Sequence, residues 1–329
     1  MEFINRIKKK LSGKSQYDLQ NLLNKVKKIS ANYSELVICP ENTDANWLGI
    51  KNATLSMFPD KTFIIPQNYS NQIVSDNDLR VLIRTFSENK GKRIILSGFP
   101  EYYYKIINYS NKLNLNVEFI FHGGLAELNQ NTASQRLMEN IFKFAKSGKI
   151  SKIYVVKEGL DKLFTALTQV KTIRITPPVS IDENLNLKKF NDNKIHIGVF
   201  GNNSYNKNRH IQVAAAALIP DSIVHVIGEN EFSYLLPKHR VITHEQMNRK
   251  EFLEILGSMN INLYCSYSES WGQVTLESLA LGVPCLTGNN SGIIHKLKPE
   301  EKKYVLNIVD NPFVIANKIV ESLNLAPLE

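Results

Sequence analysis

The stretch INLYCSYSESWGQVTLESLALGVPCLTG, from Ile261 to Gly288, decides the fold because it contains a strand, a loop, a helix and a second strand in that order. The apolar run INLYCS predicts a buried strand, and QVTLESLALG carries its apolar residues at helical spacing. Gly282 and Pro284 follow the helix pattern, and this pair is typical of a helix end. The segment PCLTG predicts the next strand. Two strands joined through a helix indicate a parallel sheet.

The same alternation of strand and helix patterns runs through most of the chain. Before residue 176 the strand candidates are SELVICP, TFIIP, RIILSG, VEFIFHGG and KIYVV, and after residue 194 they are IHIGVFG, SIVHVIG, RVIT, INLYCS, PCLTG and YVLNIV. Amphipathic stretches such as SDNDLRVLIRTFSEN and NRKEFLEILGSM separate them. Continuous apolar strands between helices predict parallel sheets that are covered on both faces.

One segment interrupts this alternation. TPPVSIDENLNLKKFNDNK, residues 176–194, has two prolines, clustered polar residues and no periodicity, which indicates a linker. A chain of 329 residues also exceeds the usual size of one domain. We therefore expect an α/β protein with two Rossmann-like doubly wound domains that face each other across a cleft. They cover residues 1–180, with a basic helical extension over 1–30, and residues 181–329, whose last helix is a candidate to pack back on the first domain.

The composition is that of an ordinary globular protein, with 43% hydrophobic and 22% charged residues. Cys39, Cys265 and Cys285 lie in or beside apolar runs and form no C-x-x-C pair, so we interpret them as reduced core thiols rather than a metal or redox site. The amino terminus lacks the apolar core of a secretory signal, and no apolar run approaches the ~18 residues of a membrane span. The sequence predicts a cytoplasmic protein.

The formal charge of +9 has much of its excess near the amino terminus. FINRIKKKL, residues 3–11, places apolar residues at helical spacing with lysines between them. Such a helix can present a solvated face, lie on the anionic inner face of a membrane, or bind nucleic acid. No zinc knuckle, RNA-recognition signature or aromatic-basic platform accompanies the charge, so we expect no nucleic-acid partner. A solvated face and a peripheral membrane contact both stay open.

Two carboxylates stand out in the stretch quoted first. Glu269 falls in the loop at the carboxyl end of a predicted strand, where open α/β sheets bind ligands. Glu277 falls about one turn into the helix, in a sector of the helical wheel shared with Val274, Ala280 and Leu281. A carboxylate near a helix start is mildly stabilised by the helix dipole, which is the structural alternative. Burial of an unpartnered charge is costly, however, and sugar hydroxyls would supply partners.

The spacing of these residues resembles the E-x7-E region of the GT-B glycosyltransferases, in particular the retaining family numbered four. The family pattern S-x-x-E-x-x-G-x-x-x-x-E-[AS]-[ML]-A-x-G-x-P stands here from Ser266 to Pro284. The resemblance implies that Glu277 holds the ribose of a nucleotide donor and that Glu269 contacts the donor sugar near the reacting centre. It also implies a diphosphate seat on the loop and helix start between them, at Ser270, Trp271, Gly272 and Gln273, where free amides favour an anion.

A weaker part of the resemblance concerns HIGVFGNNSYNKNRHIQVAAAAL, residues 196–218. In the family a G-R and a later K-G contribute cations to the diphosphate, and Lys207 matches the lysine. Asn202 stands where the arginine is expected, and Asn208 replaces the glycine. Arg209 is a candidate substitute for the missing arginine. A solvated helix start is the alternative for Lys207 and Arg209, although a departing diphosphate does require a cation.

Two further segments resemble family elements on either side of the donor. VITHEQMNRKEFLEILGSM matches the part that frames the nucleotide base, with backbone groups from Thr243 to Met247 as the expected contacts. VEFIFHGG places His122 directly after a strand, before two glycines that permit close approach. A single histidine is more often structural. The family carries a histidine at the corresponding strand end, which implies a hydrogen-bond or electrostatic role for His122 near the transferred sugar.

Two other motifs carry less weight. Asp76 and Asp78 spell the D-x-D of metal-dependent GT-A enzymes, but their place before LRVLIRTF is typical of a helix start with acidic first-turn residues. We therefore expect no metal site and no cofactor beyond the donor itself. The loop after the first strand lacks the family's Gly-rich sequence, so Asp44, Asn46 and Trp47 are acceptor candidates by position alone.

The sequence thus predicts a hexosyltransferase-type GT-B enzyme, EC 2.4, that moves a sugar from a nucleotide sugar to a glycan or lipid-linked acceptor. The donor expected is a UDP- or GDP-sugar, the resemblance implies retention of configuration, and surface polysaccharide synthesis is the expected setting. Two alternatives stay open. One is a catalytically silent GT-B partner subunit of a glycosyltransferase complex, and the other is a nucleotide-sugar epimerase of the same fold.

Overall fold

The structure, a computed structural model, describes residues 17–41, 45–68, 71–130, 132–181, 184–188, 190–228 and 231–328. Two compact units make up these residues. The first comprises the described residues up to Phe121 with Leu137–Tyr154 and Phe164–Thr172, and the second comprises His122–Arg136, Val155–Leu163 and the described residues from Ile173 onward. The predicted basic extension lies outside the described residues as far as residue 16. None of the described helices is both long and apolar enough to cross a membrane.

The first sheet has six strands in the order β2-β1-β5-β6-β7-β8. Its strands are β1 (Glu35–Pro40), β2 (Thr62–Ile65), β5 (Arg93–Ser97), β6 (Asn116–Phe121), β7 (Lys152–Val155) and β8 (Thr172–Arg174). A separate antiparallel pair joins β3 (Gln67–Asn68) to β4 (Asn71–Gln72). The ladders among β2, β1, β5 and β6 are parallel, and β1 and β5 are almost fully buried. This arrangement confirms the predicted doubly wound sheet.

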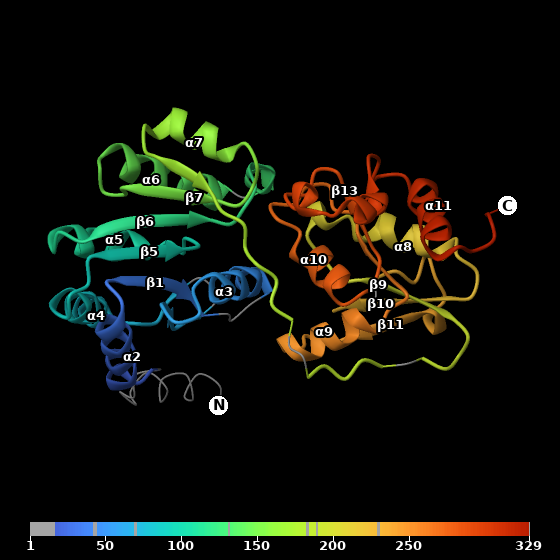
Figure 1. Ribbon diagram of the computed structural model, residues 1–329, viewed down its shortest axis with the longest axis horizontal. Coiled ribbons are helices and arrows are strands. Elements are labelled where there is room, and N and C mark those ends of the chain that lie inside the picture. Colours follow the sequence, from blue (N-terminus) through green and yellow to red (C-terminus); the bar gives the residue numbers. More distant parts are fainter. Residues whose placement is uncertain are drawn as a thin grey trace, which may run out of the picture. The chain divides into compact units, whose positions relative to one another are not determined.

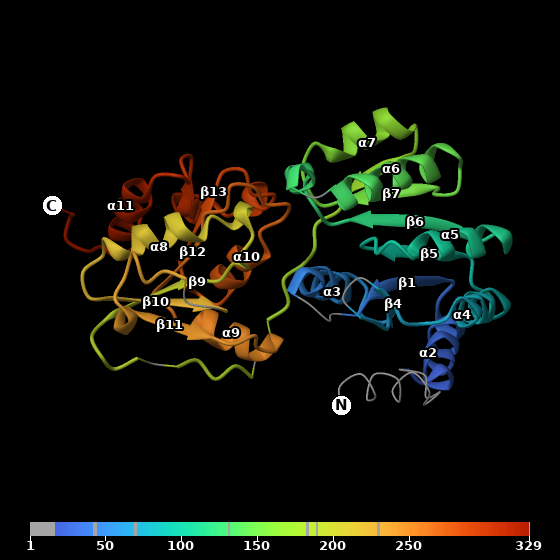
Figure 2. The ribbon, with the colours of Figure 1, turned by 180° about the vertical axis from the view of Figure 1, so that it is seen from behind.

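The connections of this sheet are mostly helical, as its parallel strands require. Helix α2 (Leu19–Asn32) precedes the first strand, and the connecting helices are α3 (Ala45–Met57), α4 (Asp76–Glu88), α5 (Tyr103–Lys112), α6 (Thr132–Lys146) and α7 (Leu160–Thr168), with a 3₁₀ turn η1 (Leu125–Gln130). Figures 1 and 2 show the strands side by side with helices packed around them. Helix α4 begins after Ser75, whose hydroxyl accepts from the Asp78 amide at 3.1 Å. The D-x-D segment is therefore a helix start, as predicted.

The second sheet is parallel throughout, in the order β11-β10-β9-β12-β13-β14. Its strands are β9 (Ile195–Val199), β10 (Ser222–Ile227), β11 (Val241–His244), β12 (Ile261–Tyr264), β13 (Cys285–Gly288) and β14 (Val305–Leu306). In chain order this reads 3-2-1-4-5-6, the order of dinucleotide-binding domains. The winding direction reverses between β9 and β12, and ligands of such sheets bind outside the carboxyl ends of strands at that point.

Four helices and several short turns connect these strands. The helices are α8 (Arg209–Ala217), α9 (Arg249–Gly257), α10 (Gln273–Ala280) and α11 (Pro312–Leu323), and the 3₁₀ turns are η2 (Tyr205–Lys207), η3 (Lys238–Arg240), η4 (Ile294–Lys296) and η5 (Pro299–Tyr304). Among the described residues between β8 and β9, where we predict the linker, there is no helix or strand. Helix α11 buries Ile315 and Ile319 in the core of the second unit, against α8 and the sheet.

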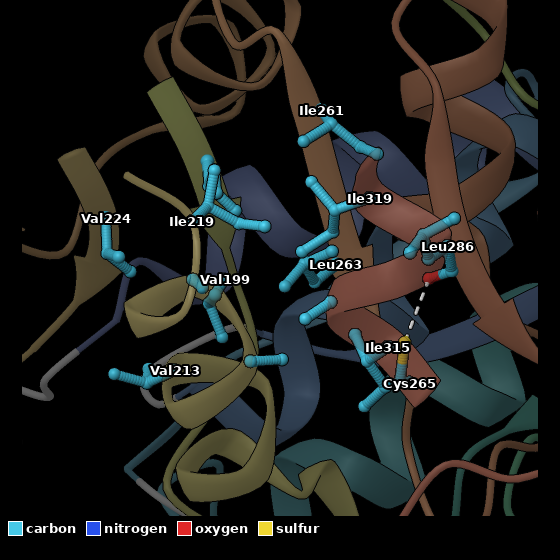
Figure 3. Packing of buried hydrophobic residues seen from close by; sticks show 14 of the residues in the cluster. Val199, Val213, Ile219, Val224, Ile261, Leu263, Cys265, Leu286, Ile315 and Ile319 are labelled. Carbon is cyan, nitrogen blue, oxygen red and sulfur yellow. Dashed lines mark hydrogen bonds between the residues drawn. The ribbon is translucent and has the colours of Figure 1, made fainter. Parts of the chain in front are cut away.

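Apolar side chains from the strands and from the helices packed on them fill the core of the second unit (Figure 3). Val199 and Leu263 of the central strands lie in one buried cluster with Val213 of α8 and Ile319 of α11. Cys265 belongs to the same cluster, and its thiol contacts the Leu286 carbonyl oxygen at 3.6 Å. All three cysteines are free and buried, which confirms them as core thiols.

Candidate functional site

The loops that follow β9 and β12 meet at the reversal point of the second sheet. Because these two strands are neighbours, their carboxyl ends bring residues 200–208 and 265–272 together. The Tyr267 amide donates to the Asn206 carbonyl at 2.8 Å, which joins the two loops directly. The structure thereby brings together two residues that the sequence separates by more than sixty positions, Lys207 and Glu269.

Lys207 and Glu269 form an ion pair between the Nζ and Oε1 atoms. Lys207 Nζ also donates to the Tyr264 hydroxyl at 3.0 Å, and the Ser266 hydroxyl donates to Glu269 Oε1 at 3.3 Å. The Lys207 and Glu269 side chains retain only 17% and 8% of their exposure. The pair is therefore a shielded charge pair at the ligand edge of the sheet, not a surface salt bridge.

The protonation of this pair follows from its surroundings. Burial opposes a charge on Lys207, but the neighbouring Tyr264 and Glu269 outweigh it and raise the pKa of Lys207 above its ordinary value. Burial raises the pKa of Tyr264 as well, so its phenol stays protonated and acts as the acceptor for Lys207. Lys207 therefore keeps a full positive charge at neutral pH, as a partner for a phosphate must.

Helix α10 starts directly after this loop, and its first amides have no acceptors inside the helix. Gly272 is the residue before the helix, with φ of 92°, and a side chain there would collide with Ser291. Glycine is thus required for both its backbone angle and its space. The Ser270 carbonyl packs against Gly292, and Trp271 is buried in an apolar cluster. Trp271 is therefore a structural support of the loop.

Glu277 is buried, as its apolar wheel sector predicts, with 1% of its surface exposed. Its Oε1 lies 2.6 Å from Nη2 of Arg249, the first residue of α9. Burial raises the pKa of Glu277, while the Arg249 cation and a hydrogen bond with Gln273 oppose that rise. Glu277 thus has a cationic partner that the sequence pattern does not reveal. Because Arg249 is two residues beyond the expected base loop, the pair also joins that loop to α10.

The two departures from the family pattern have local structural roles. Asn208 has φ of 54° and ψ of 35°, the left-handed conformation that the family glycine would supply, and asparagine tolerates it better than most residues. Its amide donates to the carbonyls of Cys265 at 2.9 Å and Val309 at 2.5 Å, which a glycine could not do. Asn202 accepts from the Ser204 amide at 3.3 Å and so shapes its own loop.

Arg209, the candidate substitute for the family arginine, is 5% exposed. Its guanidinium donates to the Ile227 carbonyl at 3.2 Å, lies 3.5 Å from Glu231 and stacks over the Phe232 ring at 5.1 Å. These contacts tie the start of α8 to the end of β10. A diphosphate contact by Arg209 stays a prediction, and it requires the guanidinium to exchange some of these partners.

The remaining predicted residues lie in or shortly after the carboxyl ends of strands. Thr243 is exposed on β11, and Met247 packs partly against the apolar cluster that contains Phe200. His122 directly follows β6 and is itself part of the second unit; burial lowers its pKa to about 4, so the ring is neutral near pH 7. A Cβ placed on nearby Gly124 would lie 3.9 Å from the Ser268 hydroxyl. Gly124 therefore lies beside the loop that carries Glu269.

Two further residues near the site belong to no motif that could be recognised in the sequence. One is Arg249, described above. The other is Lys157, whose Nζ donates to the Glu269 carbonyl at 2.6 Å and also to the Asn290 carbonyl. This lysine fixes the main chain of the loop that presents Glu269. Of the acceptor candidates, Asp44 lies outside the described residues, and the side chains of Asn46 and Trp47 are likewise outside them.

Residues 180–328 match the family of glycosyl transferases group 1. The second domain is a group 1 glycosyltransferase domain. The match includes every element of the site from β9 to α10. No protein of curated function matches the chain in sequence at a significant level.

Solved structures show that the likeness of fold reaches beyond this domain. HepE from Anabaena, in complex with UDP and glucose, shares 13% identity and a TM-score of 0.65 over 88% of this chain and 89% of its own. Sucrose-phosphate synthase from Thermosynechococcus elongatus shares 14% identity and a TM-score of 0.61 over 88% of this chain and 89% of its own. WaaG, a glycosyltransferase involved in lipopolysaccharide biosynthesis, shares 16% identity and a TM-score of 0.54 over 77% of this chain and 87% of its own. These likenesses show that the chain has the GT-B fold, and the group 1 match over residues 180–328 supports a glycosyltransferase.

Proposed function

We propose that this glycosyltransferase takes a UDP- or GDP-sugar as its donor and transfers the sugar, with retention of configuration, to a glycan or lipid-linked acceptor. The observation that carries the donor assignment is the placement of Lys207, Glu269 and the start of α10 at the reversal point of the second sheet. A shielded lysine and free helix amides suit a diphosphate, and the carboxylates on either side suit hydroxyl groups.

Each residue has a specific task in this proposal. Glu277 accepts hydrogen bonds from the ribose hydroxyls, and Arg249 keeps it ionised for that purpose. The amides of Gly272 and Gln273 hold the diphosphate together with Lys207. As the glycosidic bond breaks, negative charge develops on the departing nucleotide, and the positive charge of Lys207 stabilises it.

Glu269 orients the sugar on the other side of the diphosphate. Its pairing with Lys207 places the carboxylate within a few ångströms of the cation that receives the leaving group. His122 is neutral and can donate a hydrogen bond to the sugar. The proposal assigns no enzyme nucleophile. The departing phosphate itself assists the acceptor on the same face of the sugar, which accounts for retention.

Surface polysaccharide synthesis at the inner face of a membrane is the proposed setting, because the basic segment near the amino terminus suits an anionic surface. A catalytically silent partner subunit stays the main rival, favoured by Asn202 in the place of an arginine. A buried Glu277 and a shielded Lys207–Glu269 pair are costly features that a silent subunit would not need.

A thermal-shift titration tests the donor site. UDP, GDP, ADP and CDP are added to the wild type, to Glu277→Gln and to Lys207→Met. We expect one nucleotide to raise the Tm of the wild type by several degrees at saturation, and both variants to lose most of that shift. Stabilisation of Glu277→Gln equal to that of the wild type would overturn the ribose assignment. Hydrolysis of the donor sugar without acceptor separates an active enzyme from a silent subunit, and recovery of an altered donor sugar would indicate an epimerase.

A further inference from the structure

Three histidine rings form a continuous hydrogen-bonded row through the second sheet. His196 Nε2 lies 3.0 Å from the Asp192 carboxylate, and its Nδ1 lies 2.8 Å from His225 Nε2. His225 Nδ1 then lies 2.9 Å from His244 Nε2. We call Asp192 and these three histidines the histidine relay. His196 and His225 are 2% and 1% exposed, so the row passes through the interior of the unit.

The strand register sets the direction of the relay. His196 is the second residue of β9 and pairs with Ile223 of β10, whereas His225 lies two residues further along β10. His244 ends β11 and pairs with Ile227, again two residues further along. The relay therefore crosses three adjacent strands diagonally. It begins at the amino-terminal edge of the sheet, beside the linker residue Asp192, and ends at the carboxyl edge where ligands bind.

The contact between Asp192 and His196 determines which ring nitrogen of each histidine carries the hydrogen. An ionised Asp192 only accepts, so His196 must carry its hydrogen on Nε2 and accept at Nδ1. His225 then donates from Nε2 and accepts at Nδ1, and His244 donates from Nε2. Burial lowers the pKa of His225 to about 3, and burial followed by Lys188 lowers that of His244, so both rings are neutral near pH 7. His244 Nδ1 is consequently left with a lone pair.

The surroundings of His244 suit a nucleotide base. The ring lies 6.3 Å from that of Phe200, which shares an apolar cluster with Met247. Arg249, five residues after His244, reaches Glu277 at 2.6 Å, so the loop after β11 lies within one arginine length of the proposed ribose carboxylate. A base is attached directly to its ribose. Among the residues that the structure describes, His244 Nδ1 has no hydrogen-bond partner.

We propose that His244 reads the edge of the donor base, and that Asp192, acting through His196 and His225, fixes its Nδ1 as a hydrogen-bond acceptor. This inference rests on the proposed nucleotide-sugar function. An acceptor at this position selects a base with a ring N–H at its pairing edge. Uracil and guanine have such a group, whereas cytosine and adenine present a bare ring nitrogen there. His244 is thus a specificity-determining residue, and the other relay members are positioning residues.

Asp192→Asn is the variant that isolates this effect. The negative charge that fixes the direction of the relay is then gone: asparagine can either accept from His196 Nε2 or donate to it, so His244 Nδ1 is no longer fixed as an acceptor. Asp192 is exposed, and asparagine has nearly the same size, so the change leaves no new cavity in the core. Asp192→Glu keeps the negative charge and serves as the conservative rescue, and Asp221→Asn is a matched control for an acidic residue outside the relay.

The experiment measures the Kd of UDP, CDP, GDP and ADP by calorimetry at pH 7.5 for the full chain and these variants. The wild type and the two control variants should bind UDP over CDP, or GDP over ADP, by about tenfold, the worth of one hydrogen bond. Asp192→Asn, and His225→Phe which interrupts the relay, should lose that ratio. Two-bond ¹H–¹⁵N spectra of the ligand-free rings report the hydrogens directly, with Nε2–H expected in all three histidines.

The outcomes separate the two proposals. If no nucleotide binds the wild type, the proposed function fails, and with it the base-reading role. If a nucleotide binds but the ratio is the same in the wild type and in Asp192→Asn, or CDP is preferred over UDP, only the relay inference is overturned. Hydrogens found on Nδ1 of the wild-type rings overturn it as well, whatever the nucleotide result.

Discussion

Replacement of Arg249 by methionine removes the cation that faces Glu277 while it keeps most of the apolar stem. Glu277 would then be a carboxylate with 2% of its side chain exposed and no cationic partner, since Arg249 supplies the one salt bridge of Glu277 among the described residues. The change therefore tests whether the carboxylate needs this partner. It does so in the absence of any ligand, and thus independently of the donor.

The structure indicates the size of the effect. Loss of one partner from a fully buried pair costs about 3–5 kcal/mol. Arg249 retains 31% of its exposure, so water already screens part of the pair and reaches the carboxylate once the arginine is gone. We therefore expect a loss of about 2 kcal/mol, somewhat below that range. For a unit of this size this corresponds to a fall in Tm of about 4–8 °C.

The effect should depend on pH, because burial raises the pKa of Glu277 above its unfolded value. For such a group the stability contribution is fully present below the unfolded pKa and is lost as the pH rises through the folded pKa. Removal of Arg249 raises the folded pKa further. The difference in Tm between the wild type and Arg249→Met should thus be small near pH 4.5 and grow towards pH 8.

Thermal unfolding of four proteins completes the test: the wild type, Arg249→Met, Glu277→Gln and the double variant, each from pH 4.5 to pH 8. In the double variant the buried carboxylate is gone, so Arg249→Met should cost much less on that background. An equal cost on both backgrounds, or a difference in Tm that does not change with pH, would refute the reasoning and make Arg249 a packing residue.

Three further predictions follow from single positions. Gly272→Ala should lower the Tm and abolish transfer, because φ of 92° strains any other residue and the new methyl group meets Ser291; unchanged transfer rates would contradict this. Asn208→Gly should lower the free energy of unfolding by about 1 kcal/mol, because the hydrogen bonds of the asparagine amide are lost. Asn208→Ala should lower it by more, because alanine is also strained at φ of 54°. If calorimetry finds the alanine variant more stable than the glycine variant, the left-handed conformation is unimportant. His122 should be neutral throughout pH 5.5–8.5, because burial lowers its pKa to about 4. Any fall of kcat/KM towards low pH should therefore be the same in the wild type and in His122→Gln; a fall that is present in the wild type and absent from the variant would contradict this.

Sequence patterns predict most of this fold because its strands are short apolar runs buried on both faces. INLYCS and IHIGVFG correspond to β12 and β9, and the residues of the linker over 176–194 that the structure describes form no helix or strand. The pairing of Lys207 with Glu269 follows from the same patterns, since both residues come after strands that the doubly wound order makes neighbours.

Other contacts had no signal in the sequence. Arg249 begins a helix with a polar first turn, where an arginine is usually solvated, and only the packing of α9 beside α10 directs it towards Glu277. The histidine relay is equally hidden. His196, His225 and His244 are separated by 29 and 19 positions, and a diagonal across three strands depends on the register of the sheet.

Asn208 has a consequence for how relatives of this chain are detected. The lysine–glycine signature describes a residue type, yet the property that the loop uses is a left-handed backbone directly after the lysine, and this chain obtains it with asparagine. Asparagine has the same left-handed conformation at Asn114, Asn193 and Asn324, all with φ between 52° and 55°. In asparagine-rich proteomes, a pattern written for backbone conformation, with glycine or asparagine after the lysine, should recover members that a glycine-only pattern discards.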